Sequence, residues 1–324
     1  MTREISIIIP TYQRLRQLNQ ILESLNLQMT HKDRIEVIIC DSFSQDNSEK
    51  LIRDKYENKA KFKLKYININ ENILSSKRNV GIKNSSYDHL ILIDDDCIPD
   101  NDFIDTYSLD FDRIDKKTIL SGVVKYPVNN IKKSNYLKFR SQTHFQKNSV
   151  NIDSEIEPHN IVAMNMGFFK SKKILNTHLF NENFIGYGFE DFEFGYRLKF
   201  EGFKLKQTKA TIIHDEGDPK FKLYLKKYFH LGRDGMKNLL EINPSAAKET
   251  IYYKIENNFF FKIVVNFPKA YILLIIIEKI VIIIEKNKIF LPFLYNLARL
   301  SSYAKGYIFR GKKDLKSENI NWYE

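Results

Sequence analysis

The 324-residue sequence lacks most features that mark secreted, membrane-spanning or repetitive proteins. Its two cysteines, Cys40 and Cys97, form no motif, so we expect buried thiols in a reducing, cytoplasmic compartment. No run of about 18 apolar residues is free of charge, which argues against a membrane-spanning helix. The first four residues lead directly into an apolar strand, so we expect no signal peptide. The sequence also has no internal repeat and no low-complexity linker.

The sequence has fewer acidic than basic residues, with 40 Asp and Glu and 51 Lys and Arg, which gives a net charge of +11. This excess favours anionic partners such as nucleic acid, acidic lipid or a phosphorylated substrate. After Asp218 the basic residues are mixed with aromatic and aliphatic ones, a mixture more typical of a membrane-binding surface than of a nucleic-acid groove. We therefore expect contact with an anionic membrane surface and no binding of nucleic acid.

Apolar runs and helical spacings alternate along the first 98 residues. The helical spacings cover residues 14–27, 48–56 and 75–84. The apolar runs predict buried strands at residues 5–9, 35–40, 63–69 and 89–93. This alternation predicts an α/β fold with a doubly wound, Rossmann-like, mostly parallel sheet, whose site lies at the carboxyl ends of its strands.

The pattern is looser between Asp100 and Asp218 and becomes helical from Lys220 onward. We expect one α/β domain over residues 1–218, with halves at 1–98 and 99–218, and a helical C-terminal region over 219–324. The elements predicted in the looser part are strands at residues 118–124, 163–170 and 211–214 and a helix at 189–201 that ends before Gly202.

Residues 259–294 are strongly apolar but carry regularly spaced charges. On a helix this spacing gives a narrow polar stripe and a wide apolar face. That face could lie on a membrane surface, which the basic residues favour, or it could pack on the rest of the chain or on another subunit. The charged positions are Lys262, Lys269, Glu278, Lys279, Glu285 and Lys286.

Three adjacent carboxylates, Asp94, Asp95 and Asp96, follow the apolar run at residues 90–93. Such groups repel one another unless a cation neutralises them. In an extended backbone, Asp94 and Asp96 point the same way and can face one divalent ion. Oxygen ligands suit Mg²⁺ or Mn²⁺, which also bind substrate phosphates. The alternative is a solvated turn whose carboxylates cap the next helix.

Other polar residues adjoin the same predicted strands. Asp41 ends the second strand, where a carboxylate can accept a hydrogen bond from a nucleotide base or a ribose. Lys77 and Arg78 lie near the start of a predicted helix and could hold phosphates or a sugar. The alternative for these two residues is an ordinary solvated helix face.

Four segments together resemble the large family 2 of glycosyltransferases with the GT-A fold: SIIIPTYQR, VIICDSFSQDNS, SSKRNVGI and LILIDDDCIP. They occur in the order and spacing of that family, and the resemblance covers roughly residues 4–218. The second segment departs from the family, which often has Asp-Asp-Gly-Ser or Asp-Asn-Gly-Ser where this chain has CDSFS. The resemblance therefore does not imply the shape of that loop.

This resemblance implies a nucleotide-sugar donor, commonly based on uridine, and a Mn²⁺ or Mg²⁺ ion. Asp94 to Asp96 would form a D-x-D-type motif, in which Asp96 is the direct metal ligand. Asp94 would assist at the metal or face the ribose. The residues implied at the donor are Pro10, Thr11, Tyr12, Arg14, Asp41, Lys77, Arg78, Asp94 and Asp95.

A further segment, GYGFEDFEFGYRL at residues 186–198, resembles the G-x-G-x-E-D-x-E element of such transferases. The resemblance implies that Asp191 is the catalytic base and that Glu190 holds hydroxyl groups of acceptor or donor. The alternative is that both acids only cap a helix. Glu193 and Arg197 are expected to form an i,i+4 ion pair, with Phe194 in the core.

His214 ends a predicted strand, and the resemblance implies that it binds the metal together with Asp96. The alternative is a histidine that only packs in the core. An acidic loop follows it at residues 215–218 and favours a polar site.

The motifs together predict an inverting, metal-dependent glycosyltransferase. It would move a sugar from a nucleotide-diphosphate donor to a hydroxyl of a growing or lipid-linked glycan, in synthesis of bacterial capsule, lipopolysaccharide or another surface polysaccharide. It would work as a peripheral protein at the inner face of the plasma membrane. A sugar-phosphate nucleotidyltransferase, a non-catalytic membrane-associated scaffold and a homo-oligomer stay open. The first of these would need a Gly- and Lys-rich loop that residues 10–14 do not supply.

Overall fold

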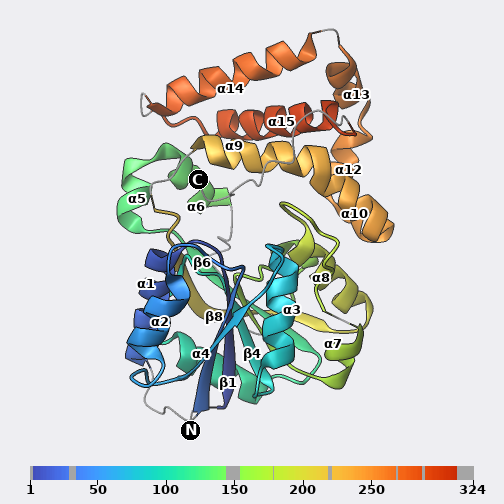
Figure 1. Cartoon of the computed structure of the whole chain (residues 1–324). Coiled ribbons are helices and arrows are strands. Elements are labelled where there is room, and N and C mark those ends of the chain that lie inside the picture. The colour runs from blue at the N-terminus through green and yellow to red at the C-terminus, as the bar shows by residue number, and fades with distance from the viewer. Residues whose placement is uncertain are drawn as a thin grey trace. The chain divides into compact units, whose positions relative to one another are not determined.

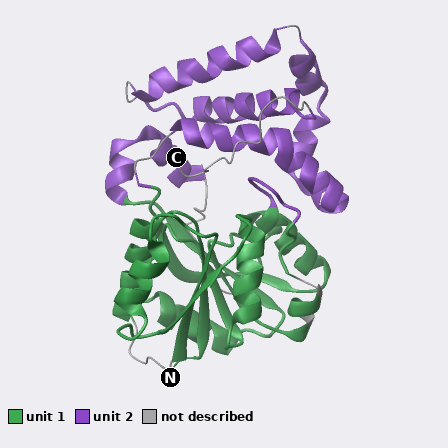
Figure 2. Ribbon diagram, in the orientation of Figure 1, with its two compact units in different colours: residues 1–127, 145–182, 190–216 green, residues 128–144, 183–189, 217–324 purple. Residues whose placement is uncertain are grey.

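The computed structural model describes residues 3–28, 34–143, 154–177, 179–217, 221–267, 269–286 and 289–311. The chain divides into two compact units, shown in green and purple in Figure 2. Unit 1 comprises residues 1–127, 145–182 and 190–216, and unit 2 comprises residues 128–144, 183–189 and 217–324. The main change between units therefore falls close to the expected boundary at residue 218. Two short segments inside the predicted α/β domain, however, belong to unit 2.

Unit 1 contains a mixed sheet whose described strands are ordered β3-β2-β1-β4-β7-β6-β8-β5 (Figure 1). Strands β1 to β4 pair with one another in parallel, whereas β7 is antiparallel to both β4 and β6. Strand β8 is parallel to β6 and antiparallel to β5. The predicted, mostly parallel α/β sheet is therefore confirmed. Its strands are β1 Ile5–Thr11, β2 Ile35–Asp41, β3 Lys63–Asn68, β4 His89–Ile93, β5 Cys97–Pro99, β6 Thr118–Lys125, β7 Asn165–Phe169 and β8 Lys204–His214.

Helices of unit 1 cover both faces of this sheet, which is why its central strands are mostly apolar on both sides. Ile5, Ile7 and Ile9 of β1 belong to one buried cluster with residues of α1 and α4. Ile8 belongs to a second buried cluster with residues of α3 and α8. A strand buried on both faces reads as a continuous apolar run, as in many parallel sheets. The helices are α1 Leu15–Gln28, α2 Ser48–Tyr56, α3 Leu74–Asn84, α4 Phe103–Arg113, α7 Lys172–Thr177 and α8 Glu190–Phe200, with a 3₁₀ turn at Pro158–Asn160.

Unit 2 is helical in its described part, as predicted for the C-terminal region. Two of its glycines allow close helix packing: a Cβ added at Gly306 would lie 1.9 Å from the backbone oxygen of Phe229, and one at Gly232 would lie 2.2 Å from that of Tyr303. A π-helical turn, Leu231–Gly235, separates α9 from α10. The helices are α5 Val128–Lys133, α6 Asn135–Thr143, α9 Phe221–His230, α10 Met236–Ile242, α11 Pro244–Glu249, α12 Ile251–Glu256, α13 Phe259–Asn266, α14 Ala270–Lys286 and α15 Pro292–Ile308.

None of the described helices is both long and apolar enough to cross a membrane.

Candidate functional site

The acidic cluster lies in a turn at the end of β4. The backbone N–H of Cys97 donates to the carbonyl of Asp94 at 3.1 Å, and Asp95 and Asp96 lie in the turn between them. The prediction of an extended backbone that points Asp94 and Asp96 the same way is therefore wrong. The tight turn places Asp95 and Asp96 against the guanidinium of one arginine and directs Asp94 toward that of another.

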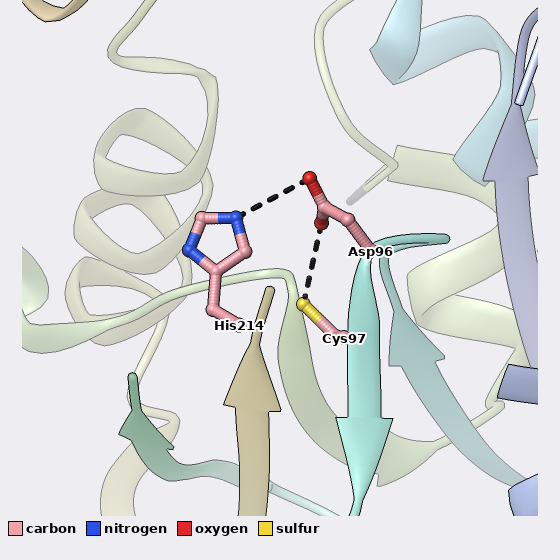
Figure 3. Close-up of side chains that lie close together, drawn as sticks. All are labelled: Asp96, Cys97 and His214. Atoms are coloured by element: carbon pink, nitrogen blue, oxygen red, sulfur yellow. Dashed lines mark hydrogen bonds and ion pairs between the residues drawn. The ribbon is translucent and has the colours of Figure 1, made fainter. Parts of the chain in front are cut away.

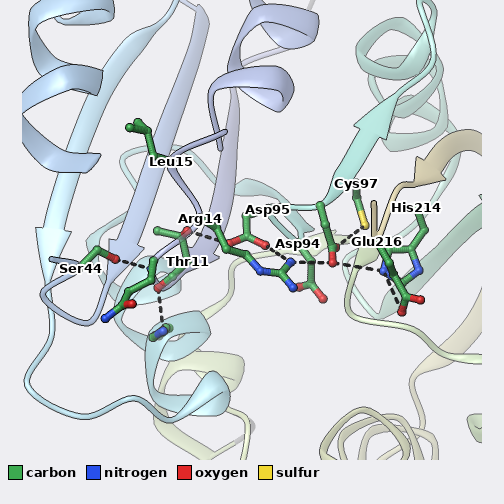
Figure 4. A network of polar contacts seen from close by, with 12 residues as sticks. Thr11, Arg14, Leu15, Ser44, Asp94, Asp95, Cys97, His214 and Glu216 are labelled. Carbon is green, nitrogen blue, oxygen red and sulfur yellow. Dashed lines mark hydrogen bonds and ion pairs between the residues drawn. The ribbon is translucent and has the colours of Figure 1, made fainter. Parts of the chain in front are cut away.

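Arg14, from the loop after β1, is the cation shared by Asp95 and Asp96 (Figure 4). Its Nη1 lies 3.0 Å from Asp95 Oδ1 and 2.7 Å from Asp96 Oδ2. The hydroxyl of Thr11 donates to the other oxygen of Asp95 at 2.7 Å. The first strand and the acidic turn are thus joined by buried, charge-assisted hydrogen bonds.

The two carboxyl groups in this turn differ in acidity. Burial, together with the nearby charge of Asp96, raises the pKa of Asp95 to about 7, although Arg14 opposes this. Burial also disfavours ionisation of Asp96, but His214 and Arg14 outweigh it and hold the pKa of Asp96 well below its usual range. Asp96 is therefore the ionised member of the pair near neutral pH.

His214 at the end of β8 faces Asp96, which directly precedes the neighbouring strand β5 (Figure 3). Its Nε2 lies 3.3 Å from Asp96 Oδ2 and 3.8 Å from Glu216 Oε1. Possible ligand atoms of Asp96, Cys97 and His214 all lie within 4.8 Å of one another. Burial raises the pKa of the Cys97 thiol well above its usual value, so this group stays protonated.

These donors fit a divalent cation of the Mn²⁺ or Mg²⁺ class. Carboxylate oxygens from Asp96 and Glu216 converge with one imidazole nitrogen from His214. Mn²⁺ accepts this mixture of oxygen and nitrogen ligands, whereas a protonated thiol contributes little to such a site. The alternative of a histidine that only packs in the core does not explain why two carboxylates face the same ring nitrogen.

The loops after β1 and β2 meet beside this turn. The N–H of Gln13 donates to Ser44 Oγ at 2.6 Å, and the Ser44 hydroxyl donates to Asp41 Oδ1 at 2.6 Å. Asp41 is 1% exposed, and its Oδ2 accepts from the Tyr66 hydroxyl at 2.9 Å and from the N–H of Ser44 at 3.0 Å. The loop that lacks the family's glycine is therefore held by Asp41 itself.

Lys77 and Arg78 are both buried at the start of α3, so the alternative of a solvated helix face is wrong for them. Lys77 Nζ donates to the carbonyl of Thr11 and to Asn72 Oδ1, each at 2.7 Å, and lies 5.4 Å from the ring centre of Tyr12. Burial lowers the pKa of Lys77 to about 8, although Asp95 and Asp41 oppose this shift. Lys77 thus connects the loop after β1 with α3.

Arg78 joins the acidic turn to the Glu190–Asp191 pair. One side-chain nitrogen, Nη2, lies 3.1 Å from Asp94 Oδ1. The other, Nη1, lies 3.0 Å from Asp191 Oδ1 and 3.6 Å from Glu190 Oε1. Burial alone would lower the pKa of Arg78, but the three carboxylates outweigh it and raise this pKa. A single guanidinium therefore neutralises acids from two segments that are far apart in the sequence.

Asp191 is held at both carboxylate oxygens in the first turn of α8. Its Oδ1 accepts from Arg78, and its Oδ2 accepts from the backbone N–H of Ala163 at 2.8 Å. Burial raises the pKa of Asp191 and Arg78 opposes the rise. Burial and the adjacent Asp191 raise the pKa of Glu190 to about 7. A carboxylate that is fixed in orientation and raised in pKa suits a general base.

Other residues of the segment 186–198 hold the helix that carries Glu190 and Asp191 in place. Arg197 Nε lies 2.9 Å from Glu193 Oε1, which confirms the predicted i,i+4 ion pair. Phe194 is fully buried, as predicted, and stacks on Phe180 with ring centres 4.1 Å apart. The guanidinium of Arg78 lies 5.4 Å from the ring centre of Phe180. The helix that carries Asp191 and the arginine that contacts it thus share one aromatic stack.

Three contributors escaped the sequence analysis. Ala163 acts through its backbone, which no side-chain motif can indicate. Phe180 lies in a segment without periodic spacing, so nothing in the sequence connects it with Arg78. Glu216 lies in the acidic loop after His214, and its position two residues beyond that histidine is the signal that could have identified it.

The sequence model of "Glycosyl transferase family 2" matches residues 6–175. Chondroitin synthase of Escherichia coli is 28% identical over 250 residues, which cover 66% of this chain and 35% of that protein. Hyaluronan synthase of Pasteurella multocida is 27% identical over 244 residues, which cover 66% of this chain and 25% of that protein. The chain thus spans only about a third or a quarter of the length of these curated relatives.

Solved structures support the fold. The S. aureus TarS 1–349 structure in complex with UDP matches with a TM-score of 0.53 and 14% identity, covering 94% of this chain and 89% of that one. The mannosyltransferase PcManGT from Pyrobaculum calidifontis, in complex with GDP-Man and Mn²⁺, matches with a TM-score of 0.55 and 12% identity, covering 93% and 87%. These likenesses confirm the predicted GT-A fold. Because the family model covers more than half of the 324 residues and includes all four N-terminal motifs, the chain belongs to glycosyl transferase family 2.

Proposed function

We propose that this chain transfers a sugar from a nucleotide-diphosphate donor, a UDP-sugar, to a hydroxyl group of a growing bacterial surface glycan, with inversion at the anomeric carbon. Family membership supports the reaction class, and relatives named chondroitin synthase and hyaluronan synthase support a glycan acceptor. The TarS structure contains UDP, which supports the choice of uridine. No observation favours the nucleotidyltransferase or the scaffold.

One observation carries the proposal: the guanidinium of Arg78 contacts both Asp94 of the acidic turn and Asp191 at the start of α8. The candidate base is therefore only one side chain away from the acids that the donor diphosphate would approach. A single-displacement transfer needs this proximity, because the acceptor oxygen must reach the anomeric carbon while its proton passes to the base.

In the proposed reaction, Asp191 takes the proton of the acceptor hydroxyl. The hydroxyl oxygen forms a bond to the anomeric carbon, the bond from that carbon to the diphosphate oxygen breaks, and its electron pair leaves with the nucleoside diphosphate. Arg78 and the N–H of Ala163 keep the Asp191 carboxylate in one orientation throughout. Glu190, whose pKa is raised to about 7, would hold hydroxyl groups of the sugars.

On the donor side, the proposal assigns the base and ribose to Pro10, Thr11, Tyr12 and Asp41. Asp96, His214 and Glu216 would hold a Mn²⁺ or Mg²⁺ ion, with Asp94 as a further candidate. Such an ion supplies positive charge to the diphosphate leaving group. Other residues proposed near the diphosphate are Arg14, Lys77, Arg78 and Asp95.

The experiment is a donor screen with the purified chain, Mn²⁺ and a panel of UDP-sugars, in which UDP and pyrophosphate are measured separately. We expect release of UDP. Asp191→Asn should lower transfer at least a thousandfold, because it removes the proton acceptor, while UDP binding measured by calorimetry stays within about threefold of wild type. Asp105→Asn, an exposed acid in α4, is the matched control and should behave as wild type. Pyrophosphate release, or normal turnover by Asp191→Asn, would refute the proposal.

The cellular setting is also part of the proposal. A lipid-linked or membrane-associated glycan acceptor would bring the reaction to the cytoplasmic face of the plasma membrane, where the chain would act as a peripheral protein. The excess of 51 basic over 40 acidic residues supports attraction to anionic lipid.

A further inference from the structure

Unit 2 exposes many large apolar side chains along α13, α14 and the start of α15. On α14, Ile272, Ile276, Ile280 and Ile283 recur three or four residues apart and are 47–59% exposed. This spacing places them along one side of the helix. Isolated exposed apolar residues are ordinary, but a contiguous series marks an interaction surface. The other exposed members are Phe259, Phe260, Ile263, Val264 and Phe267 of the α13 region, Tyr271 and Leu273 of α14, and Ile289, Leu291, Phe293, Leu297 and Leu300 around α15.

The opposite side of α14 packs within unit 2. Ala270, Leu274 and Val281 are at most 5% exposed and lie on this inner side together with Glu278. Helix α14 packs against α15, and the two helices lie side by side within unit 2 (Figure 1). The exposed isoleucines therefore do not pack in the core of unit 2.

The charged residues of α14 are divided between these two sides of the helix by the sign of their charge. Glu278 is 8% exposed and forms an ion pair with Lys305 of α15. Glu285 accepts hydrogen bonds from the Ser134 hydroxyl at 3.1 Å and from the backbone N–H of Tyr136 at 3.0 Å, and also from the Tyr295 hydroxyl. Glu278 and Glu285 are the only acids between residues 257 and 311. Both acids of this segment are thus engaged by groups of unit 2.

The lysines lie on the exposed side. Lys262, Lys269, Lys279 and Lys286 are all exposed, and Lys279 lies between Ile276 and Ile280. The outer surface therefore combines apolar side chains with positive charge, while the two carboxylates are bound within unit 2, Glu278 by Lys305 and Glu285 by hydrogen-bond donors. The polar stripe predicted from the sequence is in fact divided, with its glutamates turned inward and its lysines outward.

We propose that the outer sides of α13 and α14, with the exposed start of α15, form the surface by which this protein docks on an anionic lipid bilayer. Isoleucine and phenylalanine side chains enter the boundary between headgroups and acyl chains, and the lysines contact anionic headgroups. The 17 residues of α14 span about 25 Å, less than the hydrocarbon thickness of about 30 Å, so the helix lies in the plane of the interface. Charge complementarity selects the bilayer, since a second copy would bring the same lysines against one another.

This surface shares no residue with the proposed donor site, so the inference goes beyond the transfer reaction and is tested independently of it. The full chain is mixed with vesicles of phosphatidylcholine alone, or with about 30% phosphatidylglycerol, and floated on a density gradient. We expect flotation with the anionic vesicles, at least tenfold weaker association with the neutral ones, and weakening by 0.5 M salt. UDP release, measured on the same preparations without vesicles, reports on the proposed reaction separately.

Two double variants address the two components of the surface. Ile276→Glu with Ile280→Glu removes apolar contact, and Lys279→Glu with Lys286→Glu reverses charge. Each should weaken binding to anionic vesicles at least tenfold, without a change in thermal unfolding. Lys237→Glu with Lys248→Glu, at exposed positions of α10 and α11, makes the same change in net charge and should bind as wild type.

Equal flotation of all variants would overturn the inference, and so would binding that does not depend on lipid charge. A dimer in solution that dissociates in the Ile276→Glu, Ile280→Glu variant, with no flotation of wild type, would instead assign the surface to a second copy.

Discussion

Arg78 offers the sharpest test of how the candidate base works. Its guanidinium lies 3.0 Å from Asp191, 3.1 Å from Asp94 and 3.6 Å from Glu190, and it is nearly inaccessible to solvent. Arg78→Gln removes this charge with a modest change of volume, whereas Arg78→Lys keeps the charge but cannot contact three carboxylates in the same fork geometry. The expected effect is a change in the pH at which Asp191 becomes an effective base.

The size of the effect follows from the charge that is lost. An opposite charge at this distance lowers the pKa of a carboxyl group by about one to three units, and each unit corresponds to about 1.4 kcal/mol. Burial already raises the pKa of Asp191, and Arg78 is the group that opposes it most. Without Arg78 the pKa rises further, so a larger fraction of Asp191 is protonated at neutral pH. We expect the acid limb of kcat/KM to move upward by one to three pH units in Arg78→Gln.

The stability of the Arg78→Gln variant should also depend on pH. Carboxyl groups whose pKa is raised in the folded protein favour folding at low pH, and that contribution is lost as pH rises through the raised pKa. Removing one member of a buried charge network costs about 3–5 kcal/mol when the remaining charges are unpaired. The loss of thermal stability in Arg78→Gln should therefore be smaller at pH 5 than at pH 8.

The assay is a pH profile of kcat/KM together with thermal unfolding, for wild type, Arg78→Gln and Arg78→Lys. Arg197→Gln is the matched control, because Arg197 pairs with Glu193 on the same helix. The acid limb of this control should stay within about half a pH unit of wild type. An unchanged or lower acid limb in Arg78→Gln, in protein that is folded at the assay temperature, would refute this account of Asp191.

Two further predictions concern the metal site and the packing of unit 2. Mn²⁺ at about a hundred times its Kd should stabilise wild type by about 2.7 kcal/mol in thermal unfolding, and His214→Ala should remove most of this gain; an equal gain in both would exclude His214 as a ligand. Gly306→Ala should destabilise the protein by at least about 1–3 kcal/mol, because its Cβ would lie 1.9 Å from the carbonyl oxygen of Phe229. The same change in an unobstructed helix stabilises a protein by up to about 1 kcal/mol. A lower Tm would therefore confirm that the Cβ is obstructed at Gly306, and a higher Tm would refute it.

Much of unit 1 could be predicted because its central strands are buried on both faces. The apolar runs before Asp41 and Asp94 end where the sheet ends, so the sequence located both acids at the correct edge. Strand β8 was predicted only from residue 211, yet it begins at Lys204. Its first half alternates buried and more exposed residues beside lysines, and such a pattern lacks the continuous apolar signal.

The candidate site was harder to predict, because its groups contact one another across segments far apart in the chain. Sequence spacing could suggest that Glu193 pairs with Arg197, since both lie on one helix. No spacing relates Arg78 to Asp191, which lies 113 residues further along the chain. Nothing in the sequence indicates that Lys77 and Arg78 are buried, because a helix that begins with Leu-Ser-Ser-Lys-Arg-Asn resembles an exposed helix.

The turn at Asp94 also changes what the acidic cluster can do. Asp94 contacts Arg78 and so belongs with Asp191, whereas Asp95 and Asp96 share Arg14. The three carboxylates therefore form two charge groups rather than one. A cation added beside Asp96 would favour the ionised form of Asp95, whose pKa is raised to about 7, without loosening the hold of Arg78 on the base. The charge beside Asp96 can therefore change while Arg78 still holds Asp191 in its orientation.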